Sequence, residues 1–173
     1  LCIAKIIEPI GNNDYKPSVA RWNIATGEIN PMPYEYPDLK KVRFIYAASA
    51  EHQLYVQCYT QYDLMTICDF NGNLKCNIYG PKWVNEKTQT QHYSLGVEFC
   101  GDKILALYSG GDHRTDAYYP TKFLVFDLNG NYLKTLETGY MITDFCYDKE
   151  NNRLIINLND EIQFAYLDLE GII

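Results

Sequence analysis

The stretch KFLVFDLNGNYLKTLETGYMITDFCYDKENNRLIINLN, residues 122–159, decides the predicted fold. It opens with the apolar run Phe123–Phe126 and passes through Asn129-Gly130 into the β-prone run Tyr132–Leu136. Asn-Gly between two such runs is a strong hairpin signal, because a type I′ turn needs positive φ at both central positions. Two further strands are predicted at Ile142–Tyr147 and Arg153–Leu158. The stretch is therefore interpreted as a meander of short antiparallel strands.

This unit is repeated along the chain. An apolar run, then Asn or Asp, then a glycine-containing turn recurs four times, and the turns contain Gly27, Gly72, Gly130 and Gly171. The glycines are separated by 45, 58 and 41 residues. Repeats of about 40–50 residues with four strands each are typical of β-propeller blades. We therefore expect an all-β protein with a β-propeller fold.

About three and a half blades of four antiparallel strands fit into the 173 residues. The predicted blades are residues 1–36, which lack an inner strand, and residues 41–80, 93–137 and 140–173. A closed ring has roughly four to eight blades. The remaining blades would come from a part of the protein outside this sequence or from a second copy. We favour the former, because Leu1 falls in the middle of a blade.

The long connections of the predicted propeller all belong to one face. Connections between the first and second and between the third and fourth strands of a blade are short turns. The connections on the opposite face include the long segments 8–18, 33–41, 80–92 and 110–121. Loops on a rigid scaffold commonly carry binding residues. The alternative is that these loops only plug or cap the ring.

Charge and hydropathy restrict the partners. The formal net charge is −7 and the pI is about 4.9, which argues against nucleic acid or an anionic membrane as a partner. No apolar run reaches the roughly 18 residues of a transmembrane segment, so none is predicted. The chain begins at Leu1 without a recognisable export signal.

The six cysteines are interpreted as structural thiols. None forms a C-x-x-C pair or a zinc-like cluster with histidine, which disfavours a metal or disulfide framework. Most lie in apolar strand runs, where free cysteine behaves as a small hydrophobic residue. A two-residue loop at Asn71-Gly72 would place Cys76 opposite Ile67 and Cys68 opposite Lys75, so these two cysteines are not a direct pair.

Several motifs resemble one family of repeat proteins. They are Arg21-Trp22-Asn23 with Thr26-Gly27, the Asp-Phe-Asn-Gly and Asp-Leu-Asn-Gly turns, and Phe145–Asp148 before Asn152–Ile155. With these motifs the chain resembles the bacterial TolB-like six-bladed β-propeller proteins, which include lipoprotein-type members of unknown function. The resemblance implies the C-terminal two-thirds of a six-bladed ring and an extracytoplasmic location, in the periplasm or anchored to the outer membrane. Its motifs specify blades and no chemistry.

The densest polar cluster is Asp112-His113-Arg114-Thr115-Asp116, followed by Tyr118 and Tyr119. Acid, imidazole and guanidinium groups together can bind an anionic or sugar ligand, with His113 as acid or base. The alternative is that this glycine-flanked, charged loop is simply solvated, which is the commoner case for such loops. The candidate ligand-binding residues of this loop are Asp112, His113, Arg114, Tyr118 and Tyr119.

Trp83 is a further candidate, next to Lys82 in the connection of residues 80–92. An exposed tryptophan beside polar groups suits stacking on a sugar or docking of a peptide. The alternative is that Trp83 packs over the junction between two blades as part of the core.

Catalytic motifs are absent: the sequence has no G-x-S-x-G, no H-E-x-x-H and no phosphate-binding glycine loop. Glu98 and Asp144 lie in predicted inner strands, but they lack the amide partners found at the axial metal of gluconolactonase-like propellers. No catalytic residue, metal ligand or cofactor is predicted. We expect a non-catalytic binding or scaffold propeller that recognises a glycan, peptide or protein on its long-loop face. The alternative is a metal-dependent hydrolase or lactonase-like propeller with its site at the ring axis.

Overall fold

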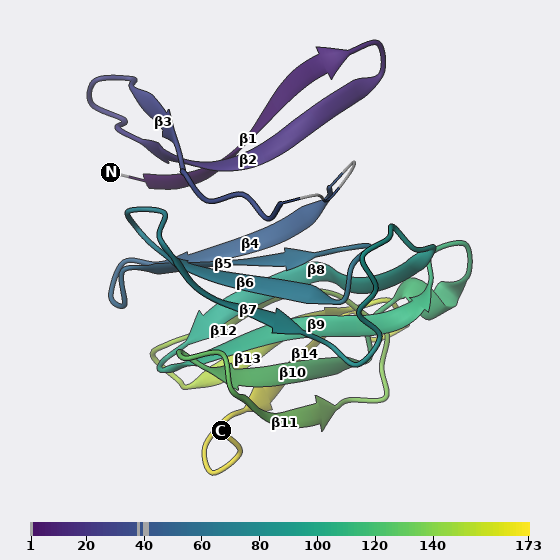
Figure 1. Cartoon of the computed structure of the whole chain (residues 1–173). Coiled ribbons are helices and arrows are strands. Elements are labelled where there is room, and N and C mark those ends of the chain that lie inside the picture. The colour runs from purple at the N-terminus through teal and green to yellow at the C-terminus, as the bar shows by residue number, and fades with distance from the viewer. Residues whose placement is uncertain (1, 38, 40–41) are drawn as a thin grey trace.

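The computed structural model describes residues 2–37, 39 and 42–173, and it consists of four antiparallel sheets that follow one another along the chain (Figure 1). The first sheet contains β1 (Cys2–Gly11), β2 (Asp14–Trp22) and β3 (Ile29–Pro31). The second contains β4 (Phe44–Ser49), β5 (Leu54–Tyr59), β6 (Leu64–Asp69) and β7 (Leu74–Tyr79). Strands that follow one another in a sheet are hydrogen-bonded neighbours, so each sheet is a meander.

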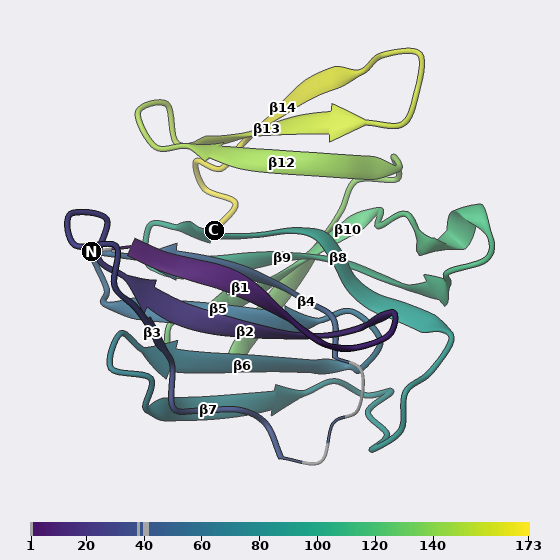
Figure 2. The ribbon, with the colours of Figure 1, turned by 90° about the horizontal axis from the view of Figure 1, so that it is seen from above.

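The third and fourth sheets repeat this arrangement. The third contains β8 (Thr90–Cys100), β9 (Lys103–Asp112), β10 (Lys122–Asp127) and β11 (Tyr132–Glu137), with the short 3₁₀ helix η1 (Asp116–Tyr118) between β9 and β10. The fourth contains β12 (Ile142–Asp148), β13 (Arg153–Leu158) and β14 (Phe164–Asp168). The strands β4, β8 and β12 open the last three sheets, and β8 contacts both β4 and β12. From above, the fourth sheet stands apart on the side of β8 and β9 (Figure 2).

The prediction of an all-β chain with antiparallel sheets of three to four strands is confirmed. Strand β13 has the predicted bounds, Arg153–Leu158. The prediction of a long irregular connection at residues 8–18 is wrong, because β1 and β2 continue as a hairpin to the turn at Asn12 and Asn13. Pro17 is tolerated in this hairpin because β3 pairs only with Ala20–Trp22, which leaves the start of β2 without a second neighbour in the described sheet.

The Asn-Gly turns are three-residue loops, and the predicted two-residue type I′ geometry is wrong. After β6, the amide of Gly72 donates to the carbonyl of Asp69 at 2.9 Å, and Gly72 has a φ of 81°. A type I turn followed by one left-handed residue has this geometry. The carboxylate of Asp69 accepts the backbone N–H groups of Asn71 and Asn73 at 2.8 and 2.9 Å. The side-chain hydrogen bond from Asn73 also lowers the pKa of Asp69.

The extra loop residue shifts the register by one position only next to the loop, because a bulge between Ile67 and Cys68 restores the predicted pairing. Cys68 lies opposite Leu74, so its predicted pairing with Lys75 is wrong, while Cys76 lies opposite Ile67 as predicted. All six cysteines are free thiols. Three of them, including Cys68, are buried, as expected for structural thiols.

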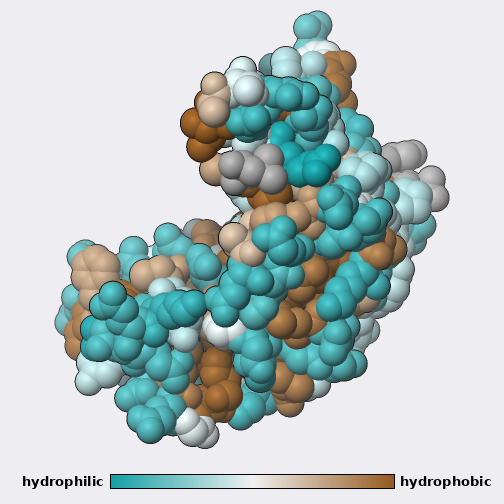
Figure 3. All heavy atoms as spheres, turned by 90° about the vertical axis from the view of Figure 1, so that its left-hand side faces the viewer, coloured by the Kyte–Doolittle hydropathy of each residue, from teal (hydrophilic) through white to brown (hydrophobic). Residues whose placement is uncertain are grey.

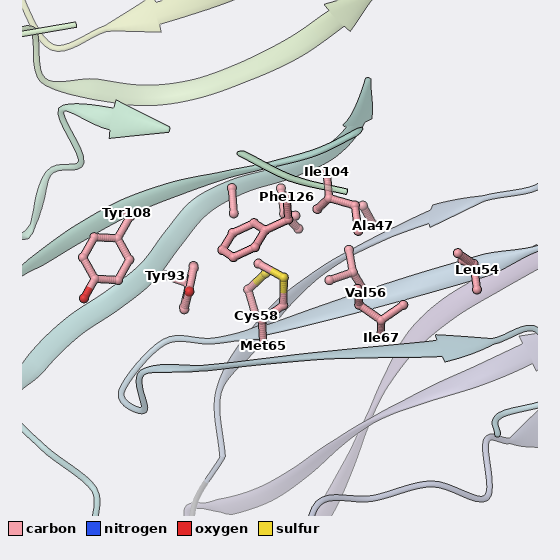
Figure 4. Close-up of a cluster of buried hydrophobic side chains, with 12 residues drawn as sticks. Ala47, Leu54, Val56, Cys58, Met65, Ile67, Tyr93, Ile104, Tyr108 and Phe126 are labelled. Atoms are coloured by element: carbon pink, nitrogen blue, oxygen red, sulfur yellow. The ribbon is translucent and has the colours of Figure 1, made fainter. Parts of the chain in front are cut away.

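Apolar faces of successive sheets pack together to form the core. One cluster fills the space between the second and third sheets, where Val56, Cys58 and Met65 face Ile104 and Phe126 (Figure 4). A second cluster joins the third and fourth sheets, and a third covers the side of the second sheet that faces the first. Each internal sheet therefore buries both of its faces, whereas the outer faces of the first and fourth sheets have no neighbouring sheet in the described part of the chain.

The two Asp-x-Asn-Gly turns, in the second and third sheets, each contact the sheet that precedes them in the chain. A Cβ atom on Gly72 would lie 2.2 Å from Cδ of Pro33, in the chain that leaves the first sheet. A Cβ atom on Gly130 would lie 2.7 Å from Sγ of Cys76, in the last strand of the second sheet. These turns therefore require glycine for two reasons: φ is positive, and the neighbouring sheet leaves no room for a Cβ atom.

The molecule is bent, and Figure 3 shows a hollow at one side, beneath the first sheet. The outer face and edge of the fourth sheet are apolar, since Ile162, Phe164 and Tyr166 are 72%, 68% and 67% exposed. Among the helical residues that the structure describes, no segment has the length and apolar character needed to cross a membrane.

Candidate functional site

The long connections lie together at one end of the sheets, which we call the long-connection end (Figure 1, right). It carries the segments between β3 and β4, β7 and β8, and β9 and β10. Tight turns join the strands at the opposite end, the tight-turn end. The ends of β8 and β9 pair as far as Thr90 and Asp112, so two of the predicted loops, 80–92 and 110–121, are shorter than expected.

The predicted Asp112–Tyr119 cluster forms a well-anchored loop. The guanidinium of Arg114 donates to both carboxylate oxygens of Asp112, at 3.0 and 2.5 Å, and lowers the pKa of that carboxyl. His113 Nδ1 lies 3.0 Å from the carbonyl oxygen of Gln89 in the neighbouring connection. The hydroxyl of Ser109 donates to the carbonyl of Ala117 at 2.6 Å and fixes the base of the loop.

Tyr118 and Tyr119 extend this loop as a stacked pair. Their ring centroids are 4.2 Å apart, with an interplanar angle of 30°. Both rings are half-buried, whereas His113 and Arg114 are exposed. The structure therefore brings five of the six predicted residues onto one connection, as a surface of paired aromatic rings beside an exposed ion pair. Such a surface offers apolar contact together with hydrogen bonding.

Trp83 belongs to a different environment. Its ring lies among Tyr36, Tyr62 and Tyr79, with centroid distances of 5.9, 6.3 and 5.1 Å. It is half-buried against the core cluster between the first two sheets. This position favours packing at the junction of two sheets, the second of the two interpretations of Trp83. Lys82 links the two regions, because its Nζ donates to the carbonyl of Gly110 at 3.2 Å.

A buried polar cluster lies beneath the connections between β7 and β8 and between β9 and β10. Asp63, in the turn between β5 and β6, is 1% exposed, and His92 at the start of β8 is also 1% exposed. The hydroxyl of Tyr108 donates to Oδ2 of Asp63 at 3.3 Å and lies 3.3 Å from Nδ1 of His92. Since that hydroxyl uses its proton on Asp63, Nδ1 of His92 must carry the proton that it shares with the tyrosine oxygen.

The chain around Asp63 is shaped to receive the carboxylate. The backbone N–H of Lys82 donates to Oδ2 at 2.9 Å, and a Cβ atom on Gly80 would lie only 2.1 Å from Oδ1. Oδ1 has no hydrogen-bond partner among the described residues, and it lies 3.8 Å from Nδ1 of His92. Burial lowers the pKa of His92, although the charge of Asp63 opposes this effect. The buried acid Asp63 thereby joins the turn between β5 and β6 to the connection between β7 and β8 and to strands β8 and β9.

Sequence reasoning identifies His92 only as part of a polar connection and does not identify Asp63 or Tyr108. The three residues are far apart in the chain, and none belongs to a recognisable motif. One local signal is present, because Tyr62-Asp63 interrupts two apolar runs at the turn between β5 and β6 without Gly or Pro. An acid in such a turn is consistent with a side chain that satisfies backbone N–H groups.

Glu98 and Asp144 lie on the neighbouring strands β8 and β12, where an axial site was the alternative prediction. Burial raises the pKa of Glu98, and the charge of Asp144 raises it further. Among the described residues, no group of three or more His, Cys, Asp or Glu side chains is arranged to hold a metal ion.

Comparisons with known proteins bear on the fold. No protein-family model and no curated protein matches the chain. Among solved structures, the chain is similar to a protein of unknown function from Bacteroides caccae, with a TM-score of 0.55 and 16% sequence identity. The similarity covers 87% of this chain and 50% of that protein, so the chain spans about half the length of its structural relative. At this identity the two proteins are similar in fold alone.

Proposed function

We propose that the four sheets are blades of a β-propeller of the TolB-like type, and that the chain is a non-catalytic binding scaffold. Its ligand would be a glycan, a peptide or a protein held at the long-connection end. Three observations support the propeller: the meander order within each sheet, the contact of β4 with β8 and of β8 with β12, and the burial of both faces of the internal sheets. An extracytoplasmic location in a bacterium is part of this proposal and rests on the resemblance alone.

The observation that carries the binding role is the contrast between the two ends. The tight-turn end offers mostly short turns, whereas the loop of residues 112–119 presents an aromatic pair and an exposed Arg–Asp pair. Hydrogen bonds from Ser109 and Lys82 and the buried Asp63 cluster hold the base of this surface. A surface that is ordered before the ligand arrives loses less conformational entropy on binding.

The binding role is tested with glycan and peptide arrays, followed by affinity measurements on Arg114→Ala and Tyr118→Ala. Arginine and aromatic anchors at an interface cost about 2 kcal/mol or more when truncated, or roughly a thirtyfold loss of affinity. Lys149→Ala is the matched control for the arginine, because Lys149 forms an exposed ion pair with Glu51 at the tight-turn end. Equal affinity of the loop variants and the wild type for an array ligand would contradict this site.

The exposed apolar surface of β14 is assigned to a further blade. Phe164 and Tyr166 lie on one face of that edge strand, opposite Asn157 and Ile155 of β13. If this surface normally lies against another blade, the isolated chain should self-associate, and Tyr166→Lys should reduce the association. Light scattering at several protein concentrations measures this. A monodisperse monomer of the 173-residue chain at all concentrations would oppose the missing-blade proposal.

A further inference from the structure

A cavity of about 240 Å³ lies between the first and second sheets at the long-connection end. Strand β2 borders it on one side, residues 34–36 after β3 border it on another, and the face of β4 and β5 forms its floor. Tyr15, Phe44, Gln57 and Tyr59 are among the residues that line it. This cavity is separate from the loop of residues 112–119.

Gln57 is the unusual residue in the floor. It is 6% exposed, and its side-chain amide has no hydrogen-bond partner among the residues that the structure describes. Strand register places it on the same face as Phe44 and Tyr59, which pair directly, so the amide belongs to the face that borders the cavity. Its amide nitrogen and oxygen are not among the fully buried polar atoms without a partner, so both groups face the cavity and are open to a molecule bound there. A ligand with both a donor and an acceptor would satisfy both groups.

The lining contains five aromatic residues, and its charged side chains have hydrogen-bond or ion-pair partners. Phe44 and Tyr59 meet edge to face, with ring centroids 6.2 Å apart. Lys16 and Glu35 pair with each other at 2.8 Å. Asp14 also lies at the border, and its carboxylate accepts the backbone N–H of the next residue at 3.0 Å. The site therefore suits a neutral molecule that has apolar faces for the rings and polar edges for the amide.

We infer that this cavity binds a single neutral sugar ring, either as a free hexose or as the terminal residue of a glycan. A volume of about 240 Å³ is somewhat below the roughly 300–1,000 Å³ of sites for drug-sized ligands, so it accommodates one ring. The axial C–H groups of a pyranose pack on the aromatic rings, and its hydroxyl groups donate to and accept from the Gln57 amide. This inference deepens the proposed function and rests on it, since it names the ligand class and a second contact region.

The inference is tested by saturation-transfer difference NMR with free glucose, galactose, mannose and N-acetylglucosamine. At least one hexose should receive saturation from the protein. Gln57→Leu keeps the approximate size of the side chain but removes the amide, and it should weaken binding of that hexose by about tenfold or more. Gln163→Leu is the matched control, because Gln163 is exposed between β13 and β14 and should leave the affinity unchanged.

A second variant covers the case in which Gln57→Leu fails to fold. Tyr15 is 38% exposed and borders the cavity, so Tyr15→Leu removes one wall ring and should also weaken binding of the hexose. Absence of saturation transfer to all four sugars would overturn the inference, and so would equal binding by wild type, Gln57→Leu and Tyr15→Leu. Binding of N-acetyltyrosinamide without any hexose would overturn it in favour of a peptide side chain.

Failure of this inference is distinguishable from failure of the proposed function. An array ligand that is lost in Tyr118→Ala but retained in Gln57→Leu would preserve the binding surface of the loop and refute the sugar cavity. Hexose binding that depends on Gln57, together with array binding unaffected by Arg114→Ala and Tyr118→Ala, would support the cavity and refute the loop as the binding surface.

Discussion

The turn at Gly130 should be far more sensitive to substitution than an open glycine turn. Gly130→Ala places a Cβ atom at a φ of 85°, which costs about 1–2 kcal/mol. The same Cβ would lie 2.7 Å from Sγ of Cys76 and 3.0 Å from Cδ1 of Ile78, so repacking adds about 1–3 kcal/mol. The expected loss of unfolding free energy is therefore about 2–5 kcal/mol, a large part of the roughly 5–15 kcal/mol of a typical domain.

The assay is urea denaturation of wild type, Gly130→Ala and Gly139→Ala. Gly139 has a φ of 75°, and a Cβ atom added there would have nothing within 4 Å, so its alanine variant should lose only the conformational part. The double variant Gly130→Ala/Cys76→Ala removes the nearest contact, and a double-mutant cycle should recover part of the packing cost. Equal midpoints for Gly130→Ala and Gly139→Ala would refute the contact between sheets as the reason for glycine here.

Three further outcomes are expected. Tyr108→Phe removes the hydroxyl between Asp63 and His92 and should lower the free energy of unfolding, measured in urea, by about 1–3 kcal/mol. Tyr132→Phe is the control, because it removes an exposed hydroxyl and should lower that free energy by less than about 0.5 kcal/mol. Burial lowers the pKa of His92, so the unfolded chain binds the proton more readily than the folded chain does. The free energy of unfolding should therefore fall as the pH drops below about 6.5. If the free energy of unfolding of His92→Gln depended on pH as steeply as that of the wild type, this would be contradicted. Maleimide should modify exposed Cys146 in the native protein and should not modify buried Cys58, because burial raises the pKa of the Cys58 thiol. Mass spectrometry measures the labelling, and rapid labelling of both cysteines would contradict the described core.

The repeat and the strand positions could be predicted from sequence because their signals are local. Leu54–Tyr59 and Arg153–Leu158 are apolar-rich runs bounded by polar turns, so their ends are readable residue by residue. The turn type could not be read from Asn-Gly alone. Asp69 captures the amides of Asn71 and Asn73 and thereby selects a three-residue loop over type I′.

The hairpin of β1 and β2 shows a second limit of local signals. Pro17 and the Asn12-Asn13 pair favour an irregular segment when residues 8–18 are considered alone. In the fold, β1 and β2 pair beyond the end of β3, and a proline in a two-stranded projection removes no hydrogen bond on the open side. Whether residues 8–18 form strands depends on which strands are at the edge of the sheet, and only the tertiary structure shows this.

Some residues of the candidate site could be predicted from the sequence and others could not, again because only local signals are visible there. Asp112, His113 and Arg114 could be selected from sequence because they are adjacent, and their mutual bonding is a property of one loop. Asp63 and Tyr108 are brought together by the packing of the second sheet against the third, over a separation of 45 residues. No short window of sequence contains both, so their contact becomes visible only when the sheets are placed.

Gln57 has a signal in the sequence, but its role depends on the structure. The run Leu-Tyr-Val-Gln-Cys-Tyr of β5 is buried at every position, and Gln57 is its one strongly polar side chain. Alternation places Gln57 with Tyr55 and Tyr59 on one face, so an amide must lie among aromatic rings whichever way the strand is turned. A glutamine in that position requires a partner, a water molecule or a ligand. The sequence thus places one polar amide among aromatic side chains, and the structure adds that a cavity of about 240 Å³ lies next to it.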